Sequence, residues 1–130
     1  MEEKLEKRKI LLIDDHEGFL ETVSYWLKAK GHSVMTATHC EAGLKIIEST
    51  PLDIVFLDMH MPKVNGVETL RRIRQIKKDL PVILVTAYLE DDLINQATEL
   101  GISGLFPKEG DFNKLLNVME VALRTHLPGQ

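Results

Sequence analysis

The sequence predicts an α/β protein, with a doubly wound, five-stranded parallel sheet in the strand order 2-1-3-4-5 and five helices on its two faces. Short apolar runs alternate along the chain with segments whose apolar residues recur at helical spacing, which is the pattern of successive βαβ units. Three of these runs are almost entirely apolar, as strands covered on both faces must be.

The predicted strands are apolar or β-branched runs over residues 9–14, 33–37, 53–58, 81–87 and 103–106. The second and fifth are the weakest, so we expect one or both to lie at the edges of the sheet.

The predicted helices place apolar residues on one face, and they cover residues 17–30, the segment from Thr38 to Ile47, and residues 66–78, 90–100 and 111–126. Gly31 and Gly101 end the first and fourth of these helices. Trp26 falls on the apolar stripe of the first, and Thr38 with Glu41 predicts a capping box at the start of the second.

The composition indicates one domain of 130 residues with a net charge of −4. We expect a charged extension over 1–8, the folded domain over 9–126, and a tail or the start of a linker over 127–130. The net charge gives no indication of the basic face that binding nucleic acid would need, so we expect no nucleic-acid partner, and no apolar run approaches the length of a membrane span. The single cysteine, Cys40, excludes an internal disulfide and is typical of a cytoplasmic protein.

Polar residues gather where the predicted strands end. Asp14 and Asp15 end the first strand, Asp58 the third and Thr86 the fourth, and Lys108 follows the fifth. Ligands of open α/β sheets bind beyond the carboxyl ends of the strands, where the strand order reverses. Because the first and third strands are neighbours in the predicted order, three carboxylates would share one crevice.

Such a cluster needs cationic compensation, since like charges about 4 Å apart repel by roughly 4 kcal/mol near a protein surface. Lys108 supplies one positive charge, and oxygen ligands at an open site suit Mg²⁺. A dinucleotide fold or a flavodoxin would need a glycine- or hydroxyl-rich first turn, and Asp14-Asp15-His16 repels anions instead. A haloacid-dehalogenase-type phosphatase has a second Asp two residues after its nucleophile, where this chain has His60.

These motifs resemble the receiver domain of two-component response regulators, which has the flavodoxin-like fold. The resemblance covers about residues 9–126. It is carried by the acidic pair, by "DIVFLD" ending in Asp58, and by further motifs at Met61-Pro62, Gly66, Thr86-Ala87 and Lys108.

The resemblance implies a phosphoacceptor signalling switch, which catalyses only its own phosphorylation and dephosphorylation. Asp58 would take a phosphoryl group from the phosphohistidine of a sensor kinase or phosphotransfer protein. Asp15, Asp58 and the backbone carbonyl of His60 would bind Mg²⁺ directly, and Asp14 mainly through water.

Thr86 and Lys108 would contact phosphoryl oxygens, and movement of Thr86 would alter the face formed by residues 90–100, 103–106 and 111–126. That face would bind a downstream effector or tethered output domain, or a second copy of the chain. His16 would be a solvated loop residue or contact the water shell of the metal.

The chain departs from the family at three places. Leu105 stands where an aromatic residue is common, Glu109 follows Lys108 where the family usually has proline, and His60 and Tyr88 overhang the site and would tune hydrolysis. Pro107, which precedes Lys108, should end the fifth strand. Two other functions remain open: a receiver-like interaction module that is not phosphorylated, and a phosphatase or other hydrolase on the same topology.

Overall fold

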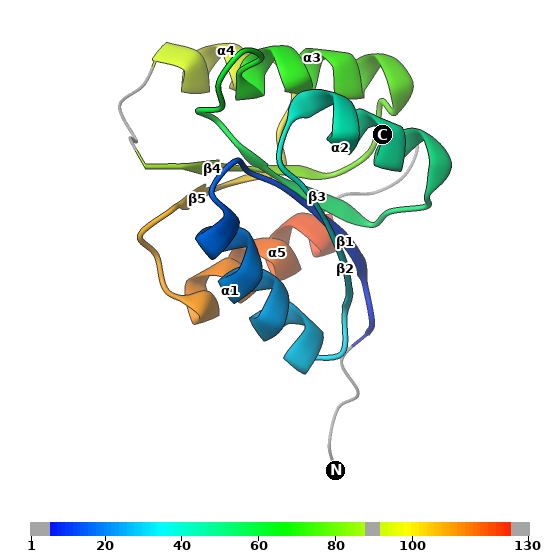
Figure 1. Cartoon of the computed structure of the whole chain (residues 1–130), viewed down its shortest axis with the longest axis vertical. Coiled ribbons are helices and arrows are strands. Elements are labelled where there is room, and N and C mark those ends of the chain that lie inside the picture. Colours follow the sequence, from blue (N-terminus) through cyan, green and yellow to red (C-terminus); the bar gives the residue numbers. More distant parts are fainter. Residues whose placement is uncertain (1–5, 88–91, 126–130) are drawn as a thin grey trace.

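Five strands form where apolar runs allow both faces of the chain to be buried (Figure 1). The computed structural model describes residues 6–87 and 92–125. The strands are β1 (Lys9–Ile13), β2 (Ser33–Ala37), β3 (Ile54–Asp58), β4 (Val82–Thr86) and β5 (Gly104–Pro107).

The strands make one parallel sheet in the order β2-β1-β3-β4-β5. This is the predicted order, and both weak strands lie at edges. β3 and β4 are buried along their whole length, whereas β2 has mostly exposed or half-buried residues. A one-residue slip of β3 would exchange the side chains facing the two halves of the core, so its register is strongly specified.

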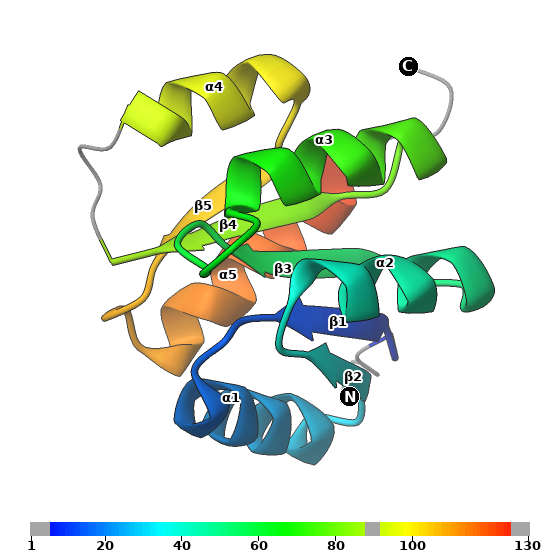
Figure 2. The same cartoon turned by 45° about the horizontal axis from the view of Figure 1, so that its top comes forward.

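The helices are α1 (Glu17–Ala29), α2 (Cys40–Ser49), α3 (Gly66–Ile76), α4 (Asp92–Leu100) and α5 (Phe112–Thr125). Figures 1 and 2 show α1 and α5 on one face of the sheet and α2, α3 and α4 on the other. Each face has its own apolar cluster, so the sheet is the shared middle layer. None of the helices in the described ranges has the length and apolar character needed to cross a bilayer.

Two glycines end helices as predicted. Gly31 and Gly101 both have φ of +97°, a left-handed conformation that glycine adopts without steric cost. Pro107 is the last residue of β5, which also agrees with the prediction. The predicted boundary at residue 126 and the first two residues of the helix expected over 90–100 lie outside the described ranges.

The predicted capping box of α2 is wrong. The N-cap is His39, whose ring Nδ1 accepts a hydrogen bond from the backbone N–H of Ala42 at 3.3 Å. The helix begins at Cys40, so Thr38 lies one residue too early to cap it.

Trp26 is less buried than its place on the apolar stripe predicts, with 39% of its surface exposed. Its ring packs against Phe112 of α5, with centroids 4.9 Å apart. Trp26 therefore covers the gap between α1 and α5 at the surface and is not part of the inner core.

Candidate functional site

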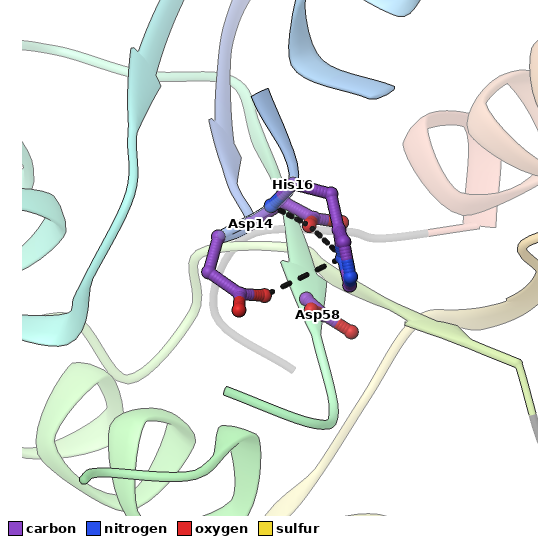
Figure 3. Close-up of side chains that lie close together, drawn as sticks. Asp14, His16 and Asp58 are labelled. Atoms are coloured by element: carbon purple, nitrogen blue, oxygen red, sulfur yellow. Dashed lines mark hydrogen bonds and ion pairs between the residues drawn. The ribbon is translucent and has the colours of Figure 1, made fainter. Parts of the chain in front are cut away.

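Three carboxylates converge at the carboxyl ends of β1 and β3. Asp14 and Asp15 follow β1, Asp58 ends β3, and the two strands pair directly. Carboxylate oxygens of all three residues and a ring nitrogen of His16 lie within 4.8 Å of one another. Figure 3 shows the contacts between Asp14 and His16, with the side chain of Asp58 lying next to them.

Asp58 is almost completely buried, with only 3% of its surface exposed. Burial, together with repulsion from Asp14, raises the pKa of its carboxyl to about 7. The N–H of His60, which donates to Oδ1 at 3.2 Å, and the charge of Lys108 lower that pKa, but they only partly offset the increase. The carboxylate form is therefore poorly compensated by the protein alone.

The loop after β3 is pressed against the backbone of Asp58. The N–H of Gly66 donates to the carbonyl of Met59 at 2.9 Å. A Cβ at Gly66 would lie 2.7 Å from the backbone oxygen of Asp58 and 2.7 Å from Cα of Met59. Asn65 then starts α3, its Oδ1 accepting from the N–H of Glu68 at 3.0 Å. Only glycine lets this loop frame the carboxylate so closely.

Lys108 reaches the carboxylates from the end of β5. Its Nζ lies 2.9 Å from Oδ2 and 3.1 Å from Oδ1 of Asp14, and 3.6 Å from Oδ2 of Asp58. The ammonium also lies 5.0 Å from the centre of the Phe19 ring. Its strongest partner is thus Asp14, and Asp58 is the more distant one.

Thr86 ends β4, where its backbone carbonyl accepts a hydrogen bond from the N–H of Lys108 at 2.8 Å. The residue is fully buried. Its neighbour Ala87, and not Thr86, lines the cleft above the carboxylates. The fold therefore brings the three carboxylates and Lys108 together and buries Thr86 completely, outside the lining of this cleft.

The cleft above the carboxylates has a volume of about 420 Å³. It is lined by His16, Phe19, Asp58, His60, Ala87 and Lys108. His60 thus lies at the site as expected, whereas Tyr88 is outside the described residues. The space is enough for a small polyatomic anion together with a cation.

His16 takes a larger part in the site than the sequence suggested. Its side chain is 65% exposed, yet its ring Nδ1 lies 3.1 Å from Asp14 Oδ1, 3.5 Å from Asp15 Oδ1 and 2.7 Å from Lys108 Nζ. The only signal in the sequence was its position directly after the acidic pair.

Leu105 and Phe106 face opposite sides of the sheet. Leu105 packs, partly buried, against the cluster beneath α2, α3 and α4, whereas Phe106 is 2% exposed in the cluster beneath α1 and α5. Successive residues of a strand alternate in this way. Phe106 therefore cannot supply the aromatic ring that Leu105 lacks.

The donor set fits Mg²⁺. Oδ2 of Asp58 is buried and accepts no hydrogen bond from the described residues, and the nearest positive charge is Lys108 at 3.6 Å. Hard oxygen donors at a site with an open side are those that Mg²⁺ prefers. A cation here would offset the repulsion that raises the pKa of Asp58.

Residues 10–120 match the family described as the response regulator receiver domain. The chain belongs to this family. Receiver domains are signalling domains of two-component systems and not conventional enzymes. The five-stranded order and the two-sided packing are those of a CheY-like receiver.

Individual relatives span different lengths. Sporulation initiation phosphotransferase F of Bacillus subtilis (strain 168) is 32% identical over 120 residues, 92% of this receiver chain and 94% of that protein. Transcriptional regulatory protein YdfI of the same organism is 28% identical over 118 residues, which make up 89% of this chain and 55% of YdfI. The chain thus spans only about half of that longer regulator.

Solved receiver structures superpose closely on the fold. The non-phosphorylated HemR receiver domain from Leptospira biflexa has a TM-score of 0.86 at 27% identity, over 95% of this chain and 100% of that one. A CheY-like receiver from Methanospirillum hungatei JF-1 has a TM-score of 0.88 at 22% identity, over 93% and 97% of the two chains.

Proposed function

We propose that this receiver domain is a Mg²⁺-dependent phosphoacceptor switch with Asp58 as the site of phosphorylation. The observation that carries the proposal is the position of Asp58, buried at the end of β3 between two further carboxylates and Lys108, and opening into the cleft.

The phosphoryl donor would be a phosphohistidine of a sensor kinase or phosphotransfer protein. An oxygen of Asp58 would form a bond to phosphorus as the bond between phosphorus and the histidine nitrogen breaks, leaving an acyl phosphate. Catalysis of such transfers depends mostly on positioning and on neutralising charge. Lys108, which now contacts Asp14, is close enough to Asp58 to move toward a phosphoryl oxygen.

Asp14, Asp15, Asp58 and the backbone carbonyl of His60 would hold Mg²⁺, which would neutralise charge on the transferred group. Asp58 reacts as a carboxylate, and its pKa of about 7 leaves much of it protonated at neutral pH. Positive charge nearby therefore favours the reactive form.

The output would follow from the new charge at Asp58. A phosphoryl group adds negative charge and acceptor oxygens, which the buried hydroxyl of Thr86 would approach by moving with the end of β4. We expect α4, β5 and α5 to present the altered face to an effector, an output domain or a second copy. The names of two relatives, a phosphotransferase and a transcriptional regulatory protein, support a relay or regulatory role.

Incubation with acetyl phosphate and Mg²⁺, followed by intact-protein mass spectrometry, tests the proposal. We expect a single phosphoryl adduct in the wild type and none in Asp58→Asn. Asp53→Asn is a matched control at the opposite end of β3, where that side chain accepts from the N–H of Lys9, and it should be phosphorylated normally.

Persistence of the adduct in Asp58→Asn would overturn the assignment of Asp58. Absence of an adduct in the wild type, with acetyl phosphate and with a phosphorylated kinase, would favour the interaction module that is never phosphorylated. Catalytic turnover of a phosphate ester that survives Asp58→Asn would favour a hydrolase.

A further inference from the structure

Phe19 lies between the cleft above the carboxylates and a second, mostly apolar cavity. The cleft has a volume of about 420 Å³. The second cavity, of about 310 Å³, lies between α1 and α5, and its lining includes Trp26 and Phe112. Phe19 and Lys108 are the residues that the two linings share. Their side chains therefore form the wall between the two spaces.

The two side chains of this wall attract each other. The Lys108 ammonium lies over the ring of Phe19, with Nζ 5.0 Å from the ring centre. The face of an aromatic ring carries partial negative charge, which attracts a cation within about 6 Å. The Lys108 side chain is only 16% exposed, so water weakens this attraction less than it would at an open surface.

Apolar packing fixes the position of the ring. Phe19 lies in the first turn of α1, is half-buried, and packs against the cluster beneath α1 and α5. Lys108 follows β5, far away in the sequence. The ring is thus anchored by the core on its own side of the sheet and does not depend on the carboxylates for its position.

The ammonium has to change partner when Asp58 is phosphorylated. Nζ of Lys108 is now 2.9 Å from Oδ2 of Asp14 and 3.6 Å from Oδ2 of Asp58. An ion pair forms at a particular carboxylate oxygen, whereas the attraction of a ring acts over its whole face. The uncharged ring of Phe19 therefore lets the ammonium move from Asp14 toward Asp58 while still attracting it.

We propose that Phe19 is a positioning residue for phosphotransfer, which keeps the Lys108 ammonium over the cleft while its partner changes from Asp14 to a phosphoryl oxygen on Asp58. The inference rests on the proposed function and extends it to a residue of α1. Phe19 acts through Lys108 and does not itself touch the reacting atoms.

The rate of phosphorylation by acetyl phosphate and Mg²⁺ in three variants of the whole chain tests this role. Phe19→Leu keeps an apolar side chain against the core and removes the ring. We expect its rate to fall by roughly 2- to 10-fold, the factor that corresponds to a cation–π attraction at a partly exposed site. Phe19→Tyr keeps the ring face and should restore most of the wild-type rate. In a Lys108→Met background, Phe19→Leu should lower the rate no further.

NMR gives a second readout, which a purely structural role of Phe19 would not affect. Protons above the face of an aromatic ring are shielded, so the methylene protons next to Nζ of Lys108 should be shifted upfield in the wild type. Phe19→Leu should abolish this shift, and Phe19→Tyr should keep it.

Phe112→Leu is the matched control. Phe112 packs in the same apolar cluster and lines the second cavity, but it is not among the residues that line the cleft. The variant should be less stable than the wild type in chemical denaturation, and its phosphorylation rate should match that of the wild type under native conditions.

A wild-type rate in Phe19→Leu, an equally slow Phe19→Tyr, an unchanged shift of the Lys108 protons without the ring, or an equal loss of rate in Phe112→Leu would overturn the role of Phe19. Each of these outcomes leaves Asp58 as the phosphoacceptor. Failure of the wild type to become phosphorylated would instead overturn the proposed function, and the role of Phe19 with it.

Discussion

The Asp58 carboxyl is 3% exposed and lies beside Asp14, so ionising it without a bound cation costs folding free energy. Its pKa is about 7 in the fold and 3.8 as the reference value. The fold therefore keeps the proton over a pH range in which the unfolded chain releases it. Stability from this group is complete below about pH 4 and is lost as the pH rises through about 7.

Asp58→Asn should remove this loss of folding stability at high pH. In a chelating buffer, we expect the variant to be more stable than the wild type by up to about 4 kcal/mol at pH 8, with the difference shrinking toward pH 4. Urea denaturation at pH 4, 6 and 8 measures it. A difference that stays constant across these pH values would contradict the assigned pKa.

Gly66 and Gly18 provide a paired test of how closely the loop approaches Asp58. A Cβ at Gly66 would meet backbone atoms at 2.7 Å, whereas a Cβ at Gly18 in α1 meets nothing within 4 Å. Gly66→Ala should destabilise the fold by about 1–3 kcal/mol and reduce phosphorylation of Asp58. Gly18→Ala should stabilise it by about 0.5–1 kcal/mol, as alanine does within a helix. Equal effects in chemical denaturation would refute the steric argument.

At the scale of elements, Arg74 ties the end of α3 to the end of α4. Its guanidinium donates to the carbonyl of Gly101 at 2.8 and 3.2 Å and to that of Leu80 at 2.8 Å. Burial lowers the pKa of this guanidinium. The bonds to Gly101 attach the residue that follows α4 to α3, and the bond to Leu80 attaches the segment that leads into β4.

Arg74→Met should therefore loosen α4 specifically. We expect a loss of about 1–3 kcal/mol in stability, together with faster amide exchange in α4 than in α1. Arg71→Met, on the same helix, is the control, because Arg71 is exposed and its ion pair with Glu68 contributes little. Uniformly faster amide exchange in all helices would show that Arg74 does not stabilise α4 specifically.

At the scale of the whole molecule, the sheet lies between two separate apolar clusters, one under each layer of helices. Leu57 of β3 is fully buried toward α2, α3 and α4, while Trp26, the one tryptophan in the sequence, lies on the α1 side. If the domain unfolds as one unit, a substitution that leaves a cavity on one side of the sheet should lower the unfolding midpoint measured by a probe on the other side.

Leu57→Ala should destabilise the domain by about 2–5 kcal/mol through lost burial and a residual cavity. Trp26 fluorescence and far-UV circular dichroism should give the same urea midpoint in this variant. Two separate midpoints would show that the faces unfold independently.

Sequence patterns were sufficient where the cause is local. The strands, the glycine helix ends and the end of β5 at Pro107 follow from periodicity and backbone preference, which act over a few residues. The strand order is not local, and it agrees with the doubly wound topology expected of alternating strands and helices. The convergence of Asp14, Asp15 and Asp58 was also predictable, because the ends of neighbouring parallel strands meet at one edge.

Local rules misplaced the cap of α2 and the depth of Trp26. His39 caps α2 in place of Thr38 because the helix begins at Cys40. Trp26 packs against Phe112, which lies on a helix far away in the sequence. Both outcomes depend on how neighbouring elements pack.

The sequence alone therefore determined the fold and which side chains gather at the carboxyl ends of the strands. The tertiary structure alone decided how they pair, because Lys108 contacts Asp14 and His16 more closely than Asp58, and it decided that Thr86 is completely buried. Lys108 and Asp14 are 94 positions apart, and contacts of that kind depend on side-chain conformation and on packing from several elements at once. No pattern within a few residues of either one encodes that geometry.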